Sequence, residues 1–412
     1  MKFFFSAGEP SGDIHAAALI ETIKKHAPDS EFVGLGGPKM EQAGCRLVVD
    51  MTQFAVMWLW QALKRYFQFR RILADARQVL LFGNIDVVIL VDYPSFNWHI
   101  AKAARELELP VVYFMPPQVW AWAQYRVKKM RRLVNLILST LPFEWQWFNQ
   151  HDCKTYFIGH PFFEEVRNKR SDPEFLESFY AQYGRAPILT LLPGSRKQEV
   201  QANLNDMLST VRKVLRELPE VQPVFAAFNE EHATMILRRL AERHMSIPVF
   251  AGRTTELIRA ADCCLAVSGS VSMELLACNK PSVICYRVGR FPHFVQRFFR
   301  RTRYITLVNL LGVSTQRGES IFYDDWFIPK EPSAADRAQM VFPEFLSCTD
   351  CSAEMATWFI RWLSEPEVLA AQKQRLETLL RKVDTIESPL ELAAEALLTG
   401  KIRSPLVAGD RR

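Results

Sequence analysis

The sequence lacks any apolar run close to the roughly 20 residues that a membrane-spanning helix needs, so we expect no bilayer-spanning segment. Glycine and proline together occupy only 40 of its 412 positions, 17 and 23 respectively. Hydrophobic residues make up 49% and charged residues 23%, which excludes collagen-like and disordered chains. At about 100 to 200 residues per domain, the length predicts two or three globular domains.

Targeting and metal-binding signals are scarce as well. The short apolar start of the chain meets a Gly-Glu-Pro-Ser-Gly-Asp turn and has no signal-peptide architecture, which predicts a cytoplasmic location. Cys348 and Cys351 have the spacing of half a zinc site, but no second Cys or His pair follows at a usable distance. We therefore expect no metal and no cofactor, and we interpret the other cysteines as reduced core thiols.

Acidic residues are absent from one strongly basic stretch. The chain carries 51 Lys and Arg against 45 Asp and Glu, a net charge of +6. Residues 286–304 contain six arginines and no acid, so this stretch alone equals the whole net charge. The arginines are Arg287, Arg290, Arg297, Arg300, Arg301 and Arg303.

What the chain does have is a regular alternation of short Val-, Ile-, Leu- and Phe-rich runs with amphipathic stretches of helical period. This pattern predicts parallel strands joined by crossover helices, an α/β fold. The expected strands of the first half are 2–7, 31–34, 86–91, 110–114, 133–139 and 155–158. Those of the second half are 188–192, 222–226, 247–250, 263–267 and 282–286.

Two such series predict two parallel sheets, with the boundary between them near residues 161–173. We expect a first domain at 1–165 and a second at 166–364. The last stretch has the pattern of helices, and we expect those at about 365–412 to return to the first domain.

The loops that follow the strands are the natural places for a site, because ligands of open parallel sheets bind beyond the carboxyl ends of strands. After the first expected strand, the turn holds Glu9, Ser11 and Asp13 between two glycines. Such a turn before a helix favours an anion or a polar ligand, and an ordinary capped turn explains it equally well. After the third strand comes Asp92, which is placed either to accept a proton from a substrate hydroxyl or to cap the next turn.

Two turns of the second half have the features of a phosphate site. Gly194, Ser195 and Arg196 lead from a strand into a helix, where amides and a guanidinium suit a diphosphate, unless Glu199 itself compensates the charge. Further on, Ser268, Gly269 and Ser270 repeat the arrangement, and Glu274 follows one turn later, where it is positioned for ribose hydroxyls. Two such turns in one domain point to a nucleotide.

Two segments have the composition of a lipid-contacting surface. The first contains Trp58, Leu59 and Trp60 followed by Lys and Arg residues, and suits either a membrane interface or a buried helix. The second is the arginine-rich stretch 286–304 with its interleaved phenylalanines, including Arg297, Arg300 and Arg301. It suits anionic lipid headgroups or nucleic acid, and a solvated basic helix is an equally good explanation.

Taken together, these motifs resemble one family, the lipid A disaccharide synthases, which are inverting glycosyltransferases of the two-domain GT-B fold. The motifs occur in the family's order over about three quarters of the chain. They are Gly8-Glu9-Pro10-Ser11-Gly12-Asp13, Asp92-Tyr93-Pro94-Ser95-Phe96-Asn97, Pro117-Gln118-Val119-Trp120-Ala121-Trp122, Leu141-Pro142-Phe143-Glu144, Ile158-Gly159-His160-Pro161, Leu192-Pro193-Gly194-Ser195-Arg196 with Glu199-Val200, Ser268-Gly269-Ser270 with Glu274, and Asn309-Leu310-Leu311.

The resemblance implies transfer of a diacylglucosaminyl group from UDP-2,3-diacylglucosamine to 2,3-diacylglucosamine 1-phosphate, which gives a β-1′,6 disaccharide 1-phosphate and UDP. It implies Asp92 as the base, Asn309 near the nucleotide, and Glu9, Ser11 and Asp13 near the sugar. It also implies peripheral contact with the inner face of an anionic membrane, with no nucleic acid partner and with the oligomeric state left open.

The chain departs from the family pattern at several points. Ser95 stands where the family commonly has Asp, and residues 312–340 intervene before a motif that usually follows within about ten residues. Two alternatives to the implied reaction stay open at the level of sequence. One is another UDP-sugar enzyme of the same fold, such as a glycolipid glycosyltransferase or a sugar-nucleotide epimerase. The other is a non-catalytic protein that binds lipid or nucleic acid.

Overall fold

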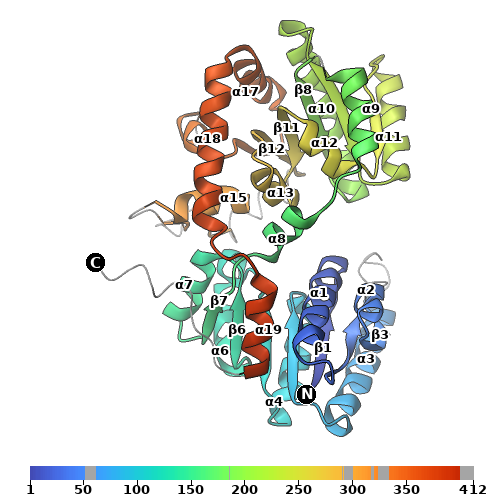
Figure 1. The fold of residues 1–412 in the computed structure, drawn as a ribbon, viewed down its shortest axis with the longest axis vertical. Coiled ribbons are helices and arrows are strands. Elements are labelled where there is room, and N and C mark those ends of the chain that lie inside the picture. Colours follow the sequence, from blue (N-terminus) through green and yellow to red (C-terminus); the bar gives the residue numbers. More distant parts are fainter. Residues whose placement is uncertain are drawn as a thin grey trace. The chain divides into compact units, whose positions relative to one another are not determined.

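The chain forms two compact α/β units, shown in Figure 1. The computed structural model describes residues 1–51, 62–184, 186–289, 291, 300–316, 320–322 and 334–399, with the side chains of 62–67, 334 and 335 excepted. The first unit contains the chain up to Pro161 and the chain from Ile386 onward, and the second runs from Phe162 to Thr385.

The first unit is built on a seven-stranded parallel sheet with the strand order β3-β2-β1-β4-β5-β6-β7. Its central strands are short apolar runs that are buried on both faces, as expected of a sheet covered by helices on each side. The strands are β1 (Lys2–Ala7), β2 (Glu31–Gly36), β3 (Arg46–Asp50), β4 (Val87–Val91), β5 (Val111–Phe114), β6 (Leu136–Ser139) and β7 (Thr155–Phe157).

Helices cover both faces of this sheet. On one face, Phe3 and Phe5 pack with buried residues of α1 and with Ala393 and Ala394 of α19, so the last described helix completes the first core. Helix α4 contacts both α3 and α6, which form a separate group with it. The helices are α1 (Pro10–His26), α2 (Pro38–Gln42), α3 (Ala62–Phe82), α4 (Pro94–Glu106), α5 (Val119–Trp122), η3 (Gln124–Arg126), α6 (Val127–Leu133), α7 (Pro142–Gln150) and α19 (Pro389–Thr399).

The second unit repeats the plan with a six-stranded parallel sheet in the order β10-β9-β8-β11-β12-β13. In both sheets the order reverses beside the first strand of the series, between β1 and β4 and between β8 and β11. The strands are β8 (Ile188–Leu192), β9 (Gln222–Ala227), β10 (Val249–Ala251), β11 (Cys263–Val267), β12 (Ser282–Arg287) and β13 (Glu344–Ser347).

The core of the second unit joins the sheet to α10, α11 and α17, with Phe225, Phe359 and Trp362 among its buried side chains. Helix α12 contacts β8 and β9, while α13 contacts β11 and α18. The helices are α8 (Pro161–Asn168), α9 (Pro173–Tyr183), α10 (Lys197–Glu217), α11 (Glu230–Glu242), α12 (Thr254–Ala260), α13 (Val271–Ala277), α15 (Leu307–Ser314), α16 (Ala334–Gln339), α17 (Ser352–Ser364) and α18 (Pro366–Val383).

The predicted class, two parallel-sheet α/β domains, is confirmed. Two strands were not predicted. β3 is short and only half-buried, and β13 follows a long stretch without a strand pattern. The expected return of the chain to the first domain at about residue 365 comes later, at Ile386, because α18 packs within the second unit. In the part of the chain that the structure describes, no helix is both long and apolar enough to cross a membrane.

Gly34 of β2 gives a direct test of how closely β1 and β2 approach. A Cβ atom on Gly34 would lie 2.0 Å from the Phe5 carbonyl oxygen, which the sheet holds in place. We expect Gly34→Ala to lower the free energy of unfolding by roughly 1–3 kcal/mol, the usual cost of overpacking. Urea unfolding measures it, with Gly269→Ala as the matched control, since a Cβ there meets nothing within 4 Å. Equal stability of the two variants would contradict the prediction.

Candidate functional site

The reversal of strand order between β1 and β4 brings two acidic side chains of the first unit to one sheet edge. Glu9 directly precedes α1, which follows β1, and Asp92 directly follows β4, which is hydrogen-bonded to β1. In open parallel sheets, this is the point at which ligands bind. The structure therefore brings together two of the acidic residues that the sequence singled out.

The backbone at Asp92 is held in an unusual conformation. Asp92 and Tyr93 have φ values of 41° and 45°, the left-handed region that side chains other than glycine rarely adopt. The Asp92 carbonyl oxygen accepts hydrogen bonds from Asn97 Nδ2 at 2.7 Å and from the Tyr113 hydroxyl at 2.6 Å. Each of these two successive residues costs about 1–3 kcal/mol in this conformation. The conformation persists because the hydrogen bonds from Asn97 and Tyr113 hold the turn.

Asn97 connects this turn to the first strand. Its side chain is fully buried, and Nδ2 lies 3.2 Å from the carbonyl oxygens of both Ser6 and Val91. In return, the Ser6 hydroxyl donates to Asn97 Oδ1 at 2.6 Å. The amide side chain thereby fixes the ends of β1 and β4 relative to each other, and sequence inspection had assigned no role to it.

The carboxyl groups at this edge have raised pKa values. Burial raises the pKa of Asp92 to about 6, and the nearby charge of Glu9 adds to the effect. Burial likewise raises the pKa of Glu144 to about 7, with a smaller contribution from Asp92. Glu144 accepts hydrogen bonds from Trp120 Nε1 at 2.9 Å and from the Ser139 hydroxyl at 2.8 Å. A carboxylate with a pKa near 6 is well matched to general-base chemistry near neutral pH.

The turn after β1 divides its residues between the surface and the interior. Glu9 is half-buried and Ser11 is exposed, whereas Asp13 is 2% exposed. The Asp13 carboxylate accepts backbone N–H bonds from Gly37 at 2.8 Å and from Lys39 and Met40 at 3.0 Å, which fixes the start of α2. The expectation that Asp13 faces the sugar is corrected here, because its oxygens are occupied inside the domain.

The aromatic loop after β5 likewise has one buried and one exposed tryptophan ring. The Trp120 ring is fully buried and packs edge-on against Phe143 at 4.9 Å, so it seals the end of the sheet. Trp122 is 45% exposed.

In the second unit, the two phosphate-type turns follow neighbouring strands. β8 and β11 pair in parallel, with Leu192 opposite Ala266, so both turns emerge at the same sheet edge. Gly194 has a φ of 111°, which favours glycine, and a Cβ there would lie 2.7 Å from the Glu199 side chain. Arg196 is exposed, and Gly269 has open space around it.

Glu199 occupies the amides of the first turn. Its Oε2 accepts hydrogen bonds from the backbone N–H groups of Ser195 and Arg196, both at 3.2 Å. Arg196 Nη1 lies 3.5 Å from Glu199 Oε1. Glu199 therefore compensates the positive end of α10, as one of the two sequence-based alternatives proposed.

Glu274 lies one turn into α13 and is 7% exposed. Its Oε1 accepts a hydrogen bond from the Thr255 hydroxyl at 2.9 Å and lies 3.7 Å from Lys169 Nζ. Ser268, Gly269 and Ser270 precede it, and Gly269 and Ser270 are exposed. These four residues thus share one corner of the second unit with α12.

Asn309 is used inside the second unit. Its Nδ2 donates to the Phe342 carbonyl at 2.8 Å and to Glu344 Oε2 at 3.0 Å, and its Oδ1 accepts from the Phe342 N–H at 2.8 Å. Glu344 also accepts N–H bonds from Ile305 and Thr306. The expectation that Asn309 reaches the nucleotide is corrected, because this buried side chain closes the loop that contains the intervening stretch 312–340.

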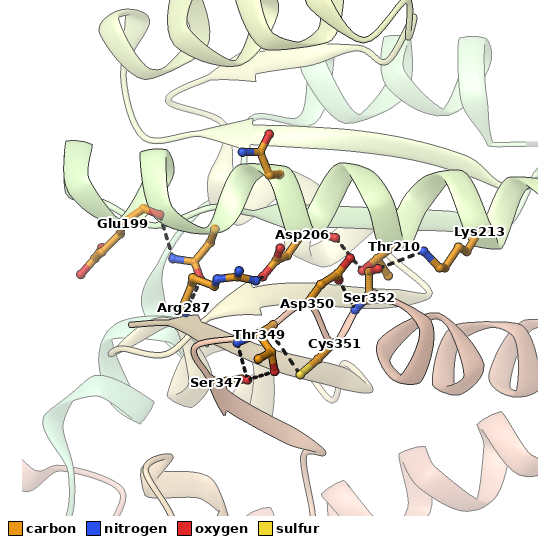
Figure 2. Close-up of polar contacts among 12 residues, drawn as sticks. Glu199, Asp206, Thr210, Lys213, Arg287, Ser347, Thr349, Asp350, Cys351 and Ser352 are labelled. Atoms are coloured by element: carbon orange, nitrogen blue, oxygen red, sulfur yellow. Dashed lines mark hydrogen bonds and ion pairs between the residues drawn. The ribbon is translucent and has the colours of Figure 1, made fainter. Parts of the chain in front are cut away.

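The end of β12 is tied to α10, as Figure 2 shows. Arg287 Nη1 lies 2.6 Å from Asp206 Oδ2, and its backbone N–H donates to Asn203 Oδ1 at 2.7 Å. Lys213 Nζ donates to the Ser352 hydroxyl at 3.0 Å beside Asp350, which accepts the Ser352 N–H at 2.7 Å. One of the six arginines of the basic stretch is thereby neutralised.

The predicted lipid surfaces fall largely beyond what the structure describes. Trp58, Leu59, Trp60 and Arg297 lie outside the described residues. Arg300 is buried, with 9% of its surface exposed, and Arg301 is half-buried. The expectation that Arg300 meets lipid headgroups is therefore corrected, because its burial removes it from the surface.

The fold defines the structural class of the protein, which is the GT-B fold with two parallel-sheet α/β units. The UDP-GlcNAc 2-epimerase from Neisseria meningitidis bound to UDP-GlcNAc superposes with a TM-score of 0.59 at 12% identity, covering 97% of this chain and 100% of that chain. The calicheamicin glycosyltransferase CalG4 superposes with a TM-score of 0.53 at 13% identity, covering 96% and 97%. Likeness at this identity concerns the fold alone.

The sequence narrows the class to one family. The model of the family described as lipid-A-disaccharide synthetase matches residues 3–323. A lipid-A-disaccharide synthase from Trichlorobacter lovleyi is 33% identical over 76% of this chain and 82% of that protein. Another from Nitrosococcus oceani is 33% identical over 74% and 79%. The chain belongs to the lipid-A-disaccharide synthetase family.

The pKa of Asp92 gives a test that does not depend on turnover. We expect NMR of isotope-labelled aspartate carboxyls to find a midpoint of about 6 for Asp92, against its ordinary value of 3.8. Glu9→Gln should lower it, though not to the ordinary value, because burial is the larger cause. The folded chain holds this proton more tightly than the unfolded chain, so this carboxyl's contribution to stability falls as the pH rises through that interval. A midpoint near 4 would contradict the site geometry.

Proposed function

We propose that the chain transfers a 2,3-diacylglucosaminyl group from UDP-2,3-diacylglucosamine to 2,3-diacylglucosamine 1-phosphate and releases UDP. Membership of the family supports the reaction type. The single observation that carries the mechanism is Asp92, a carboxyl with a pKa of about 6 at the β1–β4 edge, whose backbone is fixed by Asn97 and Tyr113.

In this mechanism, the ionised Asp92 accepts the proton of the acceptor's 6-hydroxyl as that oxygen attacks the anomeric carbon of the donor. The bond from the anomeric carbon to the diphosphate breaks on the opposite side, so the configuration inverts and UDP leaves. Ser95 stands close in sequence but is not a base, which leaves Asp92 to do this work at the turn. Glu9 and Ser11 flank the same edge and are proposed to contact the sugar.

The second unit is proposed to hold UDP. Gly194, Ser195, Arg196 and the turn 268–270 are proposed to bind the diphosphate, and Glu274 the ribose. Support comes from the emergence of both turns at the β8–β11 edge and from the exposed Arg196 guanidinium. Backbone amides and a guanidinium stabilise the charge that develops on departing UDP.

We propose peripheral action at the cytoplasmic face of the inner membrane, because both proposed substrates carry acyl chains. This placement follows from the chemistry of the substrates rather than from a spanning segment.

The function is tested by incubating the purified chain with UDP-diacylglucosamine and the monosaccharide 1-phosphate and following UDP and disaccharide by mass spectrometry. We expect stoichiometric UDP and disaccharide from the unaltered chain. Asp92→Asn should lower kcat at least about a hundredfold, since a general base contributes 10²–10⁴-fold. It should leave UDP binding nearly unchanged, because Asp92 lies in the other unit. Retained turnover in Asp92→Asn would contradict the role of Asp92 as the base. Failure of the unaltered chain to form disaccharide with donors of several acyl lengths would contradict the proposed reaction.

The diphosphate turn is tested by titration calorimetry with UDP. Arg196→Ala should weaken binding by roughly tenfold to a hundredfold, the range for a hydrogen bond to a charged group. Glu199→Gln should tighten it severalfold, because the carboxylate that now occupies the Ser195 and Arg196 amides repels the diphosphate.

Lys197→Ala is the matched control for this titration. Lys197 neighbours Arg196 but pairs with Glu231 at 2.7 Å, so its loss should change affinity less than threefold, as for an exposed ion pair. UDP affinity that is unchanged by Arg196→Ala would place the diphosphate elsewhere.

A further inference from the structure

A second basic segment lies in the first unit, where it was not recognised from the sequence. Between Glu108 and Glu144 the chain has no acidic residue, and five cations fall within residues 126–132. We call these cations and the aromatic residues just before them the α6 surface. It consists of Trp122, Tyr125, Arg126, Lys128, Lys129, Arg131 and Arg132.

The α6 surface combines exposed aromatic rings with exposed cations. Trp122, at the end of α5, is 45% exposed, and Tyr125, in η3, is 70% exposed. The Arg126 guanidinium lies 5.7 Å from the Tyr125 ring centre, and its Nε–H donates to the Tyr125 hydroxyl at 3.3 Å. Large apolar rings held out in water beside cations are unusual on a surface with no partner.

Helix α6 has one buried side and one charged side. Met130 and Leu133, three residues apart, are buried, while Lys128, Lys129, Arg131 and Arg132 are exposed. The helix lies against the unit beside β6 and α4 in Figure 1, and α4 contacts it. The charged side of α6 is therefore set by its packing and does not depend on a mobile loop.

The charges around α6 leave it positive. Arg131 pairs with Asp152 at 3.2 Å, an exposed contact. On α4, Arg105 donates to Asn135 at 3.4 Å, and Glu106 is engaged by Arg77 and Lys102. Among the ion pairs of the described residues, Asp152 thus offsets one of the five cations, Arg131.

We propose that the α6 surface docks the chain on an anionic lipid bilayer, with Trp122 and Tyr125 in the interfacial layer and the cations on the headgroups. Tyr and Trp favour this layer because each has an apolar body and a polar tip, and clustered Lys and Arg are attracted to anionic headgroups. The surface begins beyond the carboxyl end of β5, two strands from β1 at the sheet edge that carries Asp92. This inference deepens the proposed function and rests on its acylated substrates, because it names the surface that brings the edge carrying Asp92 to a membrane.

The test is co-sedimentation of the full chain with vesicles, without substrate, so that its outcome is separate from that of the turnover assay. The vesicles contain phosphatidylglycerol with phosphatidylcholine, or phosphatidylcholine alone. We expect binding to the anionic vesicles that falls as salt is raised. Lys128→Glu/Lys129→Glu should lower the partition coefficient at least about tenfold, and Trp122→Ser/Tyr125→Ser should lower it severalfold.

Matched controls separate this surface from general effects of charge and hydrophobicity. Arg212→Glu/Arg216→Glu makes the same charge change on exposed positions of α10, and Phe228→Ser removes another exposed ring, 58% exposed. Both controls should bind vesicles as the unaltered chain does. Because every substituted side chain is largely exposed, thermal unfolding midpoints should stay within a few degrees and exclude misfolding as the cause.

Three results would overturn the proposal. One is vesicle binding that survives both α6 variants. Another is loss of binding on Trp58→Ser/Trp60→Ser alone, which would assign docking to that segment, outside the described residues. The third is RNA binding with a steep salt dependence and no vesicle binding, which would assign the cations to nucleic acid.

Discussion

The candidate catalytic edge depends on one buried amide, that of Asn97. Its Nδ2 donates to the carbonyl oxygens of Ser6 in β1, of Val91 at the end of β4 and of Asp92 just after β4. Without such a tie, two successive left-handed residues at a strand end would relax, because the conformation is costly. The position of the Asp92 carboxyl is thus a consequence of hydrogen bonds made by its neighbours. Its raised pKa follows from the burial that this geometry imposes.

In the second unit, the start of α10 depends on the pairing of charges. A helix that begins with Arg196 and Lys197 has cations at the end where its dipole is already positive. Glu199 pairs with Arg196, and Glu231 pairs with Lys197. A diphosphate carries more negative charge than Glu199 does, so the proposed binding of UDP at this turn would exchange an internal anion for an external one. The two units therefore divide the proposed chemistry into a base on one and anion binding on the other.

Asp13 and Asn309 show why a motif residue near a site need not touch the ligand. Each side chain makes several hydrogen bonds with backbone groups that lie 24 to 33 residues away along the chain. Asp13 fixes the start of α2, and Asn309 with Glu344 joins the two ends of the intervening stretch. Side chains that build the frame of a site and side chains that face its ligand occur in the same motifs, because both must be specified for the site to form.

The sequence by itself determined the α/β class, the two series of strands and the strand-end turns that carry Asp92, Gly194 and Gly269. These follow from local patterns, since apolar periodicity, glycine and helix-start residues act over a few positions. The sequence did not determine which side chains at a turn make their hydrogen bonds inside the domain. It also did not determine that α18 belongs to the second unit. Those outcomes depend on partners distant in sequence, such as Ser6 for Asn97 and Gly37 for Asp13. Only the tertiary structure brings such partners within hydrogen-bonding distance and decides, as for Trp120 and Trp122, which of two neighbouring rings is buried and which is exposed.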